Sequence, residues 1–324
     1  MQIKLSVPSK TFLFGEYLAL RGGLCATLQT EPRFELHVKQ GGEGRCEGIH
    51  PHSPAGQWVR QNSAQFAAWD MEFRDPHQGR GGFGASSAQF VMVYVAGHLM
   101  QTRPQDWSRS LGAEKVWRKF REVATASEGE AQPSGADVVG QYLGGVSRFS
   151  FQPFQVKSQD WPFADLDFAL LRTGKKISTH EHLKLLKDRP FHALVEPVNR
   201  LTESLKTHRE ELFLQAFKRL AQALEEESLL AEESREQLKI LRARPEVLAA
   251  KGCGALGADT LLLLYRPQQR QAIEVLAEGM GLELVATRSD LSPGLQVNLD
   301  WLDLAQEGPS QRQEVAKGGV EYGV

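Results

Sequence analysis

The chain contains 324 residues, of which 41% are hydrophobic and 24% are charged, and its formal net charge is −2. These values are typical of a soluble globular protein with one large or two moderate domains, and they exclude a global basic field that would recruit nucleic acid. No apolar run is long enough to span a bilayer, and the N-terminus lacks the apolar segment of a signal peptide. The three cysteines lie far apart and fit no zinc-binding spacing, so we expect a cytoplasmic protein with reduced thiols and no membrane partner.

The first half of the chain combines strand patterns with a few helical segments. Ile3–Val7 alternates apolar and polar residues, as a half-buried strand does. A Pro-Ser-Lys turn then precedes the apolar segment Thr11–Leu20, which ends at an Arg-Gly-Gly turn signal. A strand at Phe34–Val38 and a loop at Gly41–Gly44 follow. Helices are expected at Gln57–Met71, in a buried segment that begins near Ser86, and at Val116–Val123.

The second half returns from helices to strands. The stretch 197–241 is rich in Leu, Glu, Lys and Arg and predicts two long amphipathic helices, before Pro245 interrupts the pattern. Its apolar faces suit the core of a second domain, and a homodimer interface is the alternative. The remaining expected elements are strands at Val146–Phe151, Asp167–Leu171, Thr260–Tyr265 and Leu282–Val285, a short helix at Ala272–Gly279, and a mobile tail after Gln306.

This order of elements predicts an α+β fold with a domain boundary between about residues 155 and 195. We place an N-terminal nucleotide-binding and catalytic domain at residues 1–170 and a second domain at residues 171–324.

A glycine-rich turn at Arg80–Phe90 is the most informative segment. Glycines are followed by Ser86 and Ser87 and then by the apolar helix, and this order suits an anion site. Glycines allow close approach of the backbone to a ligand, and the N–H groups that begin a helix attract phosphate. The alternative is a glycine turn that merely starts a helix. The glycine pattern fits neither a Walker A loop nor a dinucleotide-binding turn.

Three further segments carry candidate residues, each with an ordinary structural alternative. Pro8–Tyr17 contains Lys10 before an apolar strand and then Gly-Glu-Tyr. The alternative interpretation is that Lys10 is a solvated lysine and Glu16 is a carboxylate in a turn. Pro133–Gly140 places Asp137 after a Ser-Gly turn, where an acidic residue also complements a helix dipole. Lys251–Asp259 is glycine-rich and leads into an apolar strand, so it also suits a plain connection.

Together, in this order and at these separations, the four segments resemble motifs of the GHMP kinases, which include galactokinase, homoserine, mevalonate and phosphomevalonate kinases. The resemblance spans roughly residues 4–300. The segments resemble Pro-Gly-Lys…Gly-Glu, Gly-Leu-Gly-Ser-Ser-Ala, Ser-Gly-x-Asp and Ser-Gly-Ala-Gly-Gly-Gly. This chain departs from them at Ser9, at Ala85, which replaces the first serine or is an added residue, and at Cys253, Leu256 and Ala258. The implied fold has an N-terminal domain like the second domain of ribosomal protein S5 and a C-terminal ferredoxin-like domain.

The resemblance implies that ATP and Mg²⁺ are the cofactors of a small-molecule kinase. The ATP phosphates would lie at Gly82, Gly84, Ala85, Ser86 and Ser87. One of the two serines would be a Mg²⁺ ligand, together with a glutamate for which Glu128 is favoured over Glu122. His180 and His182 are either surface residues or part of the site.

The resemblance also implies the catalytic and acceptor-binding residues. Asp137 would accept or orient the acceptor proton, and Lys10 would stabilise negative charge on the transferred group. The acceptor side would include Glu16, Tyr17, Ser134 and Gly254. Gly15-Glu16-Tyr17 and Asp259 resemble phosphomevalonate kinases most, so phosphomevalonate is the expected acceptor. The alternative acceptors are mevalonate or another acceptor of this family. Two alternative functions stay open: a catalytically weak regulator that binds a nucleotide or metabolite, and an unrelated α+β binding protein.

Overall fold

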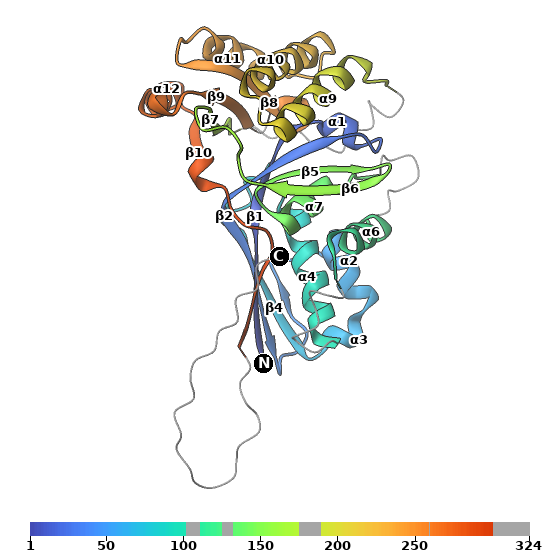
Figure 1. Cartoon of the computed structure of the whole chain (residues 1–324). Coiled ribbons are helices and arrows are strands. Elements are labelled where there is room, and N and C mark those ends of the chain that lie inside the picture. The colour runs from blue at the N-terminus through green and yellow to red at the C-terminus, as the bar shows by residue number, and fades with distance from the viewer. Residues whose placement is uncertain (102–110, 125–131, 175–188, 259, 301–324) are drawn as a thin grey trace.

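The chain folds around two β-sheets, each with helices packed against it (Figure 1). This computed structural model describes residues 1–101, 111–124, 132–174, 189–258 and 260–300. The α+β class expected from the order of elements is confirmed. Within the described ranges, no helix combines the length and the apolar character that crossing a membrane requires.

Among the described residues, the first sheet has seven strands and is built mostly from the N-terminal half. The strands of its central path are ordered β11-β1-β2-β4-β3. In addition, β5 pairs with the N-terminal part of β2, and β6 pairs with β5. All pairs are antiparallel except β3 with β4. The strands are β1 (Gln2–Phe14), β2 (Cys25–Gln40), β3 (Cys46–Glu47), β4 (Trp69–Arg74), β5 (Val146–Phe151), β6 (Phe154–Gln159) and β11 (Gln296–Asp300).

Helices cover one face of this sheet (Figure 1). Period-2 alternation in β1 places Ile3, Leu5 and Val7 in the core under them, while Lys4 on the opposite face pairs with Glu35 at 2.8 Å. The long helix α4 is apolar nearly all round and is correspondingly buried. The helices are α2 (Pro54–Gln61), α3 (Ser63–Phe66), α4 (Ala85–Gln101), α6 (Ala113–Val123) and α7 (Ala136–Leu143).

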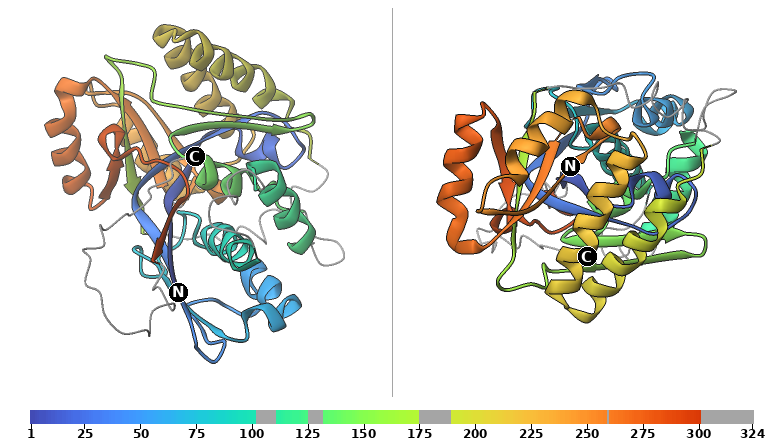
Figure 2. Two further views of the ribbon diagram at one scale, coloured as in Figure 1. Left: turned by 60° about the horizontal axis from the view of Figure 1, so that its bottom comes forward. Right: turned by 90° about the horizontal axis from the view of Figure 1, so that it is seen from above.

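The second sheet is antiparallel and has the order β10-β7-β9-β8. Its strands are β7 (Asp167–Arg172), β8 (Val247–Cys253), β9 (Thr260–Tyr265) and β10 (Glu283–Thr287). Between β7 and β8 come α9 (His192–Thr207), α10 (Glu210–Glu226) and α11 (Glu232–Arg242), and α12 (Arg270–Gly279) connects β9 to β10. This β-α-β-β-α-β order gives the expected ferredoxin-like domain. The view from above in Figure 2 shows α9, α10 and α11, in yellow to light orange, lying over the strands.

The two sheets share a junction. Leu13, Phe14, Ala26 and Leu28, from β1 and β2, belong to the same apolar cluster as the second sheet and α9–α11. The short helix α1 (Glu16–Ala19) follows β1 and lies at this junction (Figure 1). The boundary at residues 170 and 171 stays a prediction, as does a homodimer through the helices; β7 begins at Asp167, and β11 returns to pair with β1.

Several elements differ from the sequence-based expectation. The helix expected at Gln57–Met71 is confirmed only in part, because α2 ends at Gln61 and α3 ends at Phe66. The chain then turns at Ala67, and Trp69, Met71 and Phe73 bury alternate side chains of a strand. The turn predicted at Pro-Ser-Lys is wrong, since Pro8–Lys10 lies within β1. The pairing of β1 with β2 shifts register between Pro8 and Ser9 without ending the strand.

The C-terminal half also corrects two expectations. The stretch 197–241, expected to form two long helices, instead contains parts of three, α9, α10 and α11. His208 adopts a left-handed conformation (φ 54°) that ends α9, and Ser228 (φ 51°) follows the end of α10. The strand β11 was not expected. By contrast, the expected strands at Val146–Phe151 and Thr260–Tyr265 are confirmed. The tail after Gln306 lies outside the described residues.

Candidate active site

Segments from four distant parts of the sequence meet at the junction of the two sheets. Lys10 lies in the middle of β1, and its backbone N–H donates to the carbonyl of Phe83 in the glycine-rich turn at 3.0 Å. Its ammonium lies 4.0 Å from the carboxylate of Asp137. From the second domain, the Cys253 thiol at the end of β8 donates to the carbonyl of Phe12. The fold therefore brings all four candidate segments to one place.

Lys10 and Asp137 form a partly shielded pair of opposite charges. The Lys10 side chain is only 11% exposed and Asp137 is 31% exposed, so water screens their attraction less than at an open surface. Asp137 lies in the first turn of α7, directly after Gly135 and Ala136, and its Oδ1 accepts from the Val138 N–H. The Lys10 ammonium also lies 4.7 Å from the centre of the Phe12 ring. The Oδ2 atom of Asp137 therefore lies beside the Lys10 ammonium.

The glycine-rich turn presents backbone to the same region. Gly81, Gly82 and Gly84 all have positive φ, between 71° and 86°. A Cβ on Gly84 would lie 3.0 Å from Gln141 Nε2, 3.1 Å from Ser87 Oγ and 3.4 Å from Lys10 Cε. The turn opens directly into α4, whose first N–H groups have no acceptor within the helix. Bare backbone at a helix N-terminus beside a lysine is suited to a phosphate.

The two serines of the turn have different environments. Ser87 is 2% exposed, and its hydroxyl donates to the Gly84 carbonyl at 2.9 Å, so it is used to close the first turn of α4. Ser86 is exposed on the same turn. Ser86 therefore has the hydroxyl that is accessible to a ligand.

Gln141 is a site residue that the sequence analysis missed. It is fully buried, and its amide donates to the carbonyls of Pro8 and Gly84 at 3.0 and 3.1 Å. It thereby ties α7 to β1 and to the glycine-rich turn. The signal was available, because Gln141 follows Asp137 by four residues and so lies on the same helix face.

The Ser-Gly pair before Asp137 shapes the start of α7. Ser134 Oγ accepts from the Ala136 N–H at 3.3 Å, and its carbonyl accepts from Trp117 Nε1 at 2.8 Å. Gly135 has φ 72°, and a Cβ there would lie 2.7 Å from the Trp117 ring. Any larger residue would displace the tryptophan or the helix start, and with it Asp137.

The Gly-Glu-Tyr segment is tied to the second domain. Glu16 Oε1 accepts from Lys251 Nζ at 3.0 Å, and Lys251 is fully buried. Burial opposes its charge, but Cys253 and the Glu16 carboxylate outweigh that effect and raise the pKa of Lys251. Tyr17 is 4% exposed, burial raises the pKa of its hydroxyl, and its ring lies 5.3 Å from that of Phe191. The sequence analysis gave Lys251 no role, although it begins the fourth segment.

The fourth segment is a cramped turn between β8 and β9. Gly254 has φ 86°, and a Cβ on Gly252 would lie 2.6 Å from the Gly257 carbonyl. Leu256 adopts φ 51°, a conformation that costs a residue with a side chain more than it costs glycine. Burial raises the pKa of the Cys253 thiol, against the lowering effect of the nearby Lys251 ammonium.

The remaining candidate residues are Glu122 and four that the structure does not describe. Glu128, His180, His182 and Asp259 lie outside the described residues. Glu122 is 68% exposed on α6 and pairs with Lys119 at 2.6 Å. Within the described part of the chain, no group of three or more His, Cys, Asp or Glu side chains forms a metal centre. A cation here would need hydroxyl, phosphate or water oxygens in addition to a carboxylate.

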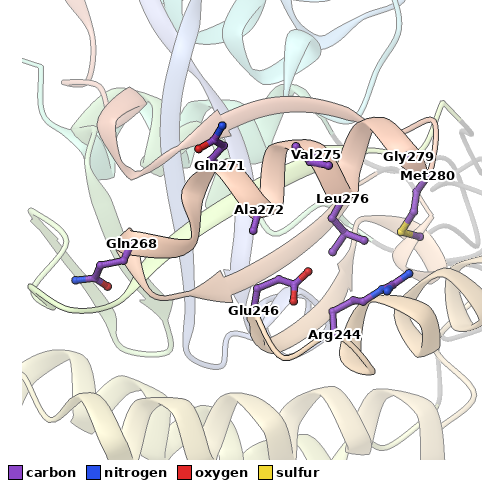
Figure 3. Close-up of a pocket in the computed structure, with 9 residues that line it drawn as sticks. All are labelled: Arg244, Glu246, Gln268, Gln271, Ala272, Val275, Leu276, Gly279 and Met280. Carbon is purple, nitrogen blue, oxygen red and sulfur yellow. The ribbon is translucent and has the colours of Figure 1, made fainter.

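Two cavities lie elsewhere, and among the described residues that line them none belongs to the four segments. One, of about 660 Å³, lies along α12 in the second domain (Figure 3). It is lined by Arg244, Glu246, Gln268, Gln271, Ala272, Val275, Leu276, Gly279 and Met280. The other, of about 790 Å³, lies over the polar face of the first sheet, beside Lys4, His37 and Glu72.

Comparisons with known structures agree with this architecture. The Lin0012 protein from Listeria innocua is similar with a TM-score of 0.70 and 15% identity, over 92% of this chain and 99% of that one. Streptococcus pneumoniae phosphomevalonate kinase, in complex with phosphomevalonate and AMPPNP, gives 0.71 and 15%, over 88% and 98%. Lactococcus lactis galactokinase complexed with galactose gives 0.70 and 11%, over 91% and 94%. No protein-family model matches the sequence, and no curated protein is significantly similar to it. The chain therefore has the GHMP kinase fold.

Proposed function

We propose that this protein, which has the GHMP kinase fold, is an ATP-dependent kinase of a small molecule. The observation that carries the proposal is the Lys10–Asp137 pair beside the glycine-rich turn at the start of α4. A fold alone does not imply an activity, so the argument depends on these residues. They are an anion site, a cation and a carboxylate, which are the parts that phosphoryl transfer requires.

The residues present fit a nucleotide. Gly82, Gly84 and Ala85 would receive the phosphates, because the two glycines have no side chain and Ala85 adds only a methyl group at the start of α4. A Cβ on Gly84 would crowd Gln141, Ser87 and Lys10. Ser86 and Ser87 complete the turn. The bound AMPPNP of the pneumococcal structure supports ATP as the donor. When bound, ATP supplies the phosphoryl group, and Mg²⁺ neutralises charge on its phosphates.

The exposed hydroxyl favours Ser86 over Ser87 as the Mg²⁺ ligand, and Glu128 stays the proposed second ligand. Mg²⁺ binds few protein oxygens and keeps phosphate oxygens and waters, which suits a site with one hydroxyl.

Ser86→Ala is expected to lower kcat/KM for ATP by at least about tenfold, whereas Ser87→Ala stays within about threefold. The reason is that Ser87 already hydrogen-bonds the Gly84 carbonyl, while Ser86 is exposed. Initial rates over a range of Mg²⁺ concentrations would measure this. A larger loss in Ser87→Ala than in Ser86→Ala would reverse the assignment.

In the proposed reaction, Asp137 holds or accepts the proton of the acceptor oxygen. An ordinary aspartate has a pKa of about 3.9, so for an acceptor that reacts through an alcohol it is a weak base, and its proton transfer must accompany phosphoryl transfer. The phosphate of phosphomevalonate is already largely ionised near pH 7, so there Asp137 would orient the attacking oxygen. Lys10 places a positive charge beside the Asp137 carboxylate and stabilises negative charge on the group in transfer. Gln141 holds the turn and β1 at a fixed distance from α7.

Phosphomevalonate is the proposed acceptor, with mevalonate or another acceptor of this family as the alternative. Glu16, Tyr17, Ser134 and Gly254 are the proposed acceptor side. A second function is favoured by one observation: Leu256 holds a left-handed conformation in the turn after β8, and side chains there replace glycines that would admit phosphate. That arrangement supports a nucleotide- or metabolite-binding regulator with weak catalysis.

The test is ATP consumption by the purified protein with phosphomevalonate, mevalonate, galactose and homoserine. We expect turnover with one acceptor, and phosphomevalonate first. AMPPNP binding without turnover on any acceptor would favour the regulator. Failure to bind AMPPNP would contradict the kinase and leave a protein of this fold that binds a ligand other than ATP.

A further inference from the structure

A chain of side-chain hydrogen bonds crosses the domain junction beside the glycine-rich turn. Ser9 Oγ lies 2.6 Å from His77 Nε2, and His77 Nδ1 lies 2.7 Å from Arg172 Nη2. Arg172 Nη1 then pairs with Glu283 at 2.8 Å. Ser9 and His77 belong to the first domain, and Arg172 in β7 and Glu283 in β10 belong to the second sheet. We call these four residues the junction relay.

The partners fix the protonation of the imidazole. Ser9 Oγ donates to the carbonyl of Pro32 at 2.6 Å, so towards His77 it accepts. Arginine has only donors, so His77 Nδ1 must accept from Arg172. The ring is therefore the neutral tautomer with its proton on Nε2. A second proton, on Nδ1, would face the guanidinium.

Burial and the net effect of the charges around His77 also favour the neutral imidazole. The imidazole is 3% exposed, and burial together with the nearby Arg172 lowers its pKa to about 4. Arg80 also lowers the pKa, whereas Asp75 and Glu283 raise it without reversing the shift. His77 is thus neutral throughout the ordinary working range of an enzyme.

The junction relay touches both segments of the proposed phosphate site. The imidazole stacks on Phe83 with ring centres 4.3 Å apart, and the Arg172 guanidinium lies 4.8 Å from the same ring. Phe83 is the buried residue between Gly82 and Gly84, and its carbonyl accepts from the Lys10 N–H. Ser9 directly precedes Lys10 and is one of the positions at which this chain departs from the motif it resembles. A glycine there would have no hydroxyl for His77.

We propose that His77 is a positioning residue, which connects Arg172 of the second domain to Ser9 and Phe83 and so holds the glycine-rich turn and Lys10 in register for ATP. The inference rests on the proposed kinase function. According to this proposal, the second domain raises the affinity for the nucleotide indirectly, because Arg172 acts through His77 and does not need to contact the nucleotide.

Nuclear magnetic resonance of histidine ring nitrogens tests the relay independently of activity. The wild-type His77 signal, identified by its loss in His77→Phe, is expected to show the Nε2–H tautomer and no titration between pH 8 and about pH 5. In Arg172→Met, the Nδ1 atom loses its donor, so the midpoint is expected to rise towards the ordinary value of about 6.5. A wild-type His77 that titrates near that value would overturn the relay.

Nucleotide affinity tests the positioning role. His77→Phe keeps the aromatic stack but removes both hydrogen bonds, and Arg172→Met removes the link to the second domain. Each is expected to raise the Kd for AMPPNP and the KM for ATP about tenfold, with kcat within about threefold. In Arg172→Met alone, KM is expected to rise further below pH 6.5, as His77 takes up a proton. The matched control is His192→Phe, at an exposed histidine on α9.

The outcomes separate the two proposals. If the wild type binds no AMPPNP, the kinase proposal fails and this inference fails with it. If the wild type binds AMPPNP and a folded His77→Phe binds it equally well, only the positioning role is overturned. Should His77→Phe not fold, Arg172→Met decides on the same measurements, because it leaves the histidine in place.

Discussion

Replacing Asp137 by asparagine is expected to lower kcat by roughly 10²–10⁴-fold, while AMPPNP binding stays within about threefold. Asparagine has nearly the same shape, and its oxygen still accepts from the Val138 N–H, so the start of α7 is preserved. What disappears is the negative charge 4.0 Å from the Lys10 ammonium and the capacity to take a proton. The measurement is the steady-state rate with the acceptor that the substrate screen identifies.

Glu114→Gln is the matched control for this substitution. Glu114 is also an acidic residue in the first turn of a helix, α6, but it is half exposed and pairs with Arg118 on the surface. Its loss is expected to leave kcat unchanged. An Asp137→Asn protein that retains wild-type turnover would refute the assigned role and would favour a mechanism in which the carboxylate only stabilises the helix.

Replacing Lys251 by methionine is expected to reduce the free energy of unfolding by about 3–5 kcal/mol, because it removes one partner of a buried ion pair. Lys251 is fully buried, and Glu16 is 11% exposed, so the remaining carboxylate would be poorly solvated at the junction. Restoring neutrality with Glu16→Gln in the same protein should recover part of the loss. Urea unfolding of the single and double variants gives both values.

The pH dependence of this stability has a defined sign. The pKa of Lys251 is raised above its unfolded value, so the stabilisation by the pair is fully present below about pH 10.4 and is lost as pH rises through the higher folded value. The difference between wild type and Lys251→Met should therefore be constant from pH 7 to 9. Arg118→Met, which breaks the exposed surface pair with Glu114, is expected to cost only about 0–1 kcal/mol. Equal losses in Lys251→Met and Arg118→Met would contradict the role of burial.

Local sequence patterns predicted the elements whose residues share one environment along their whole length. Thr260–Tyr265 reads as a continuous apolar strand because it is buried on both sides, and Val146–Phe151 is bounded by clear turn signals. Gln57–Met71 misled because helix and strand patterns overlap there, and pairing with β2 decided that Trp69 onward became a strand. Nothing local to Gln296–Asp300 indicates that it completes the first sheet, since its partner β1 lies almost 300 residues away in sequence.

The sequence by itself determined the α+β class and the residues of the candidate site: glycines before a helix, a lysine before an apolar segment, and an aspartate after a Ser-Gly turn. These are local features, because backbone freedom and helix ends depend on neighbouring residues. Only the tertiary structure decided which of them meet and what surrounds them. The Lys10–Asp137 approach, the buried Lys251–Glu16 pair and the junction relay join residues 68 to 235 positions apart. Such contacts arise when elements from distant parts of the chain pack together, within the first domain for Lys10–Asp137 and between the two domains for Lys251–Glu16. No local sequence pattern encodes that packing.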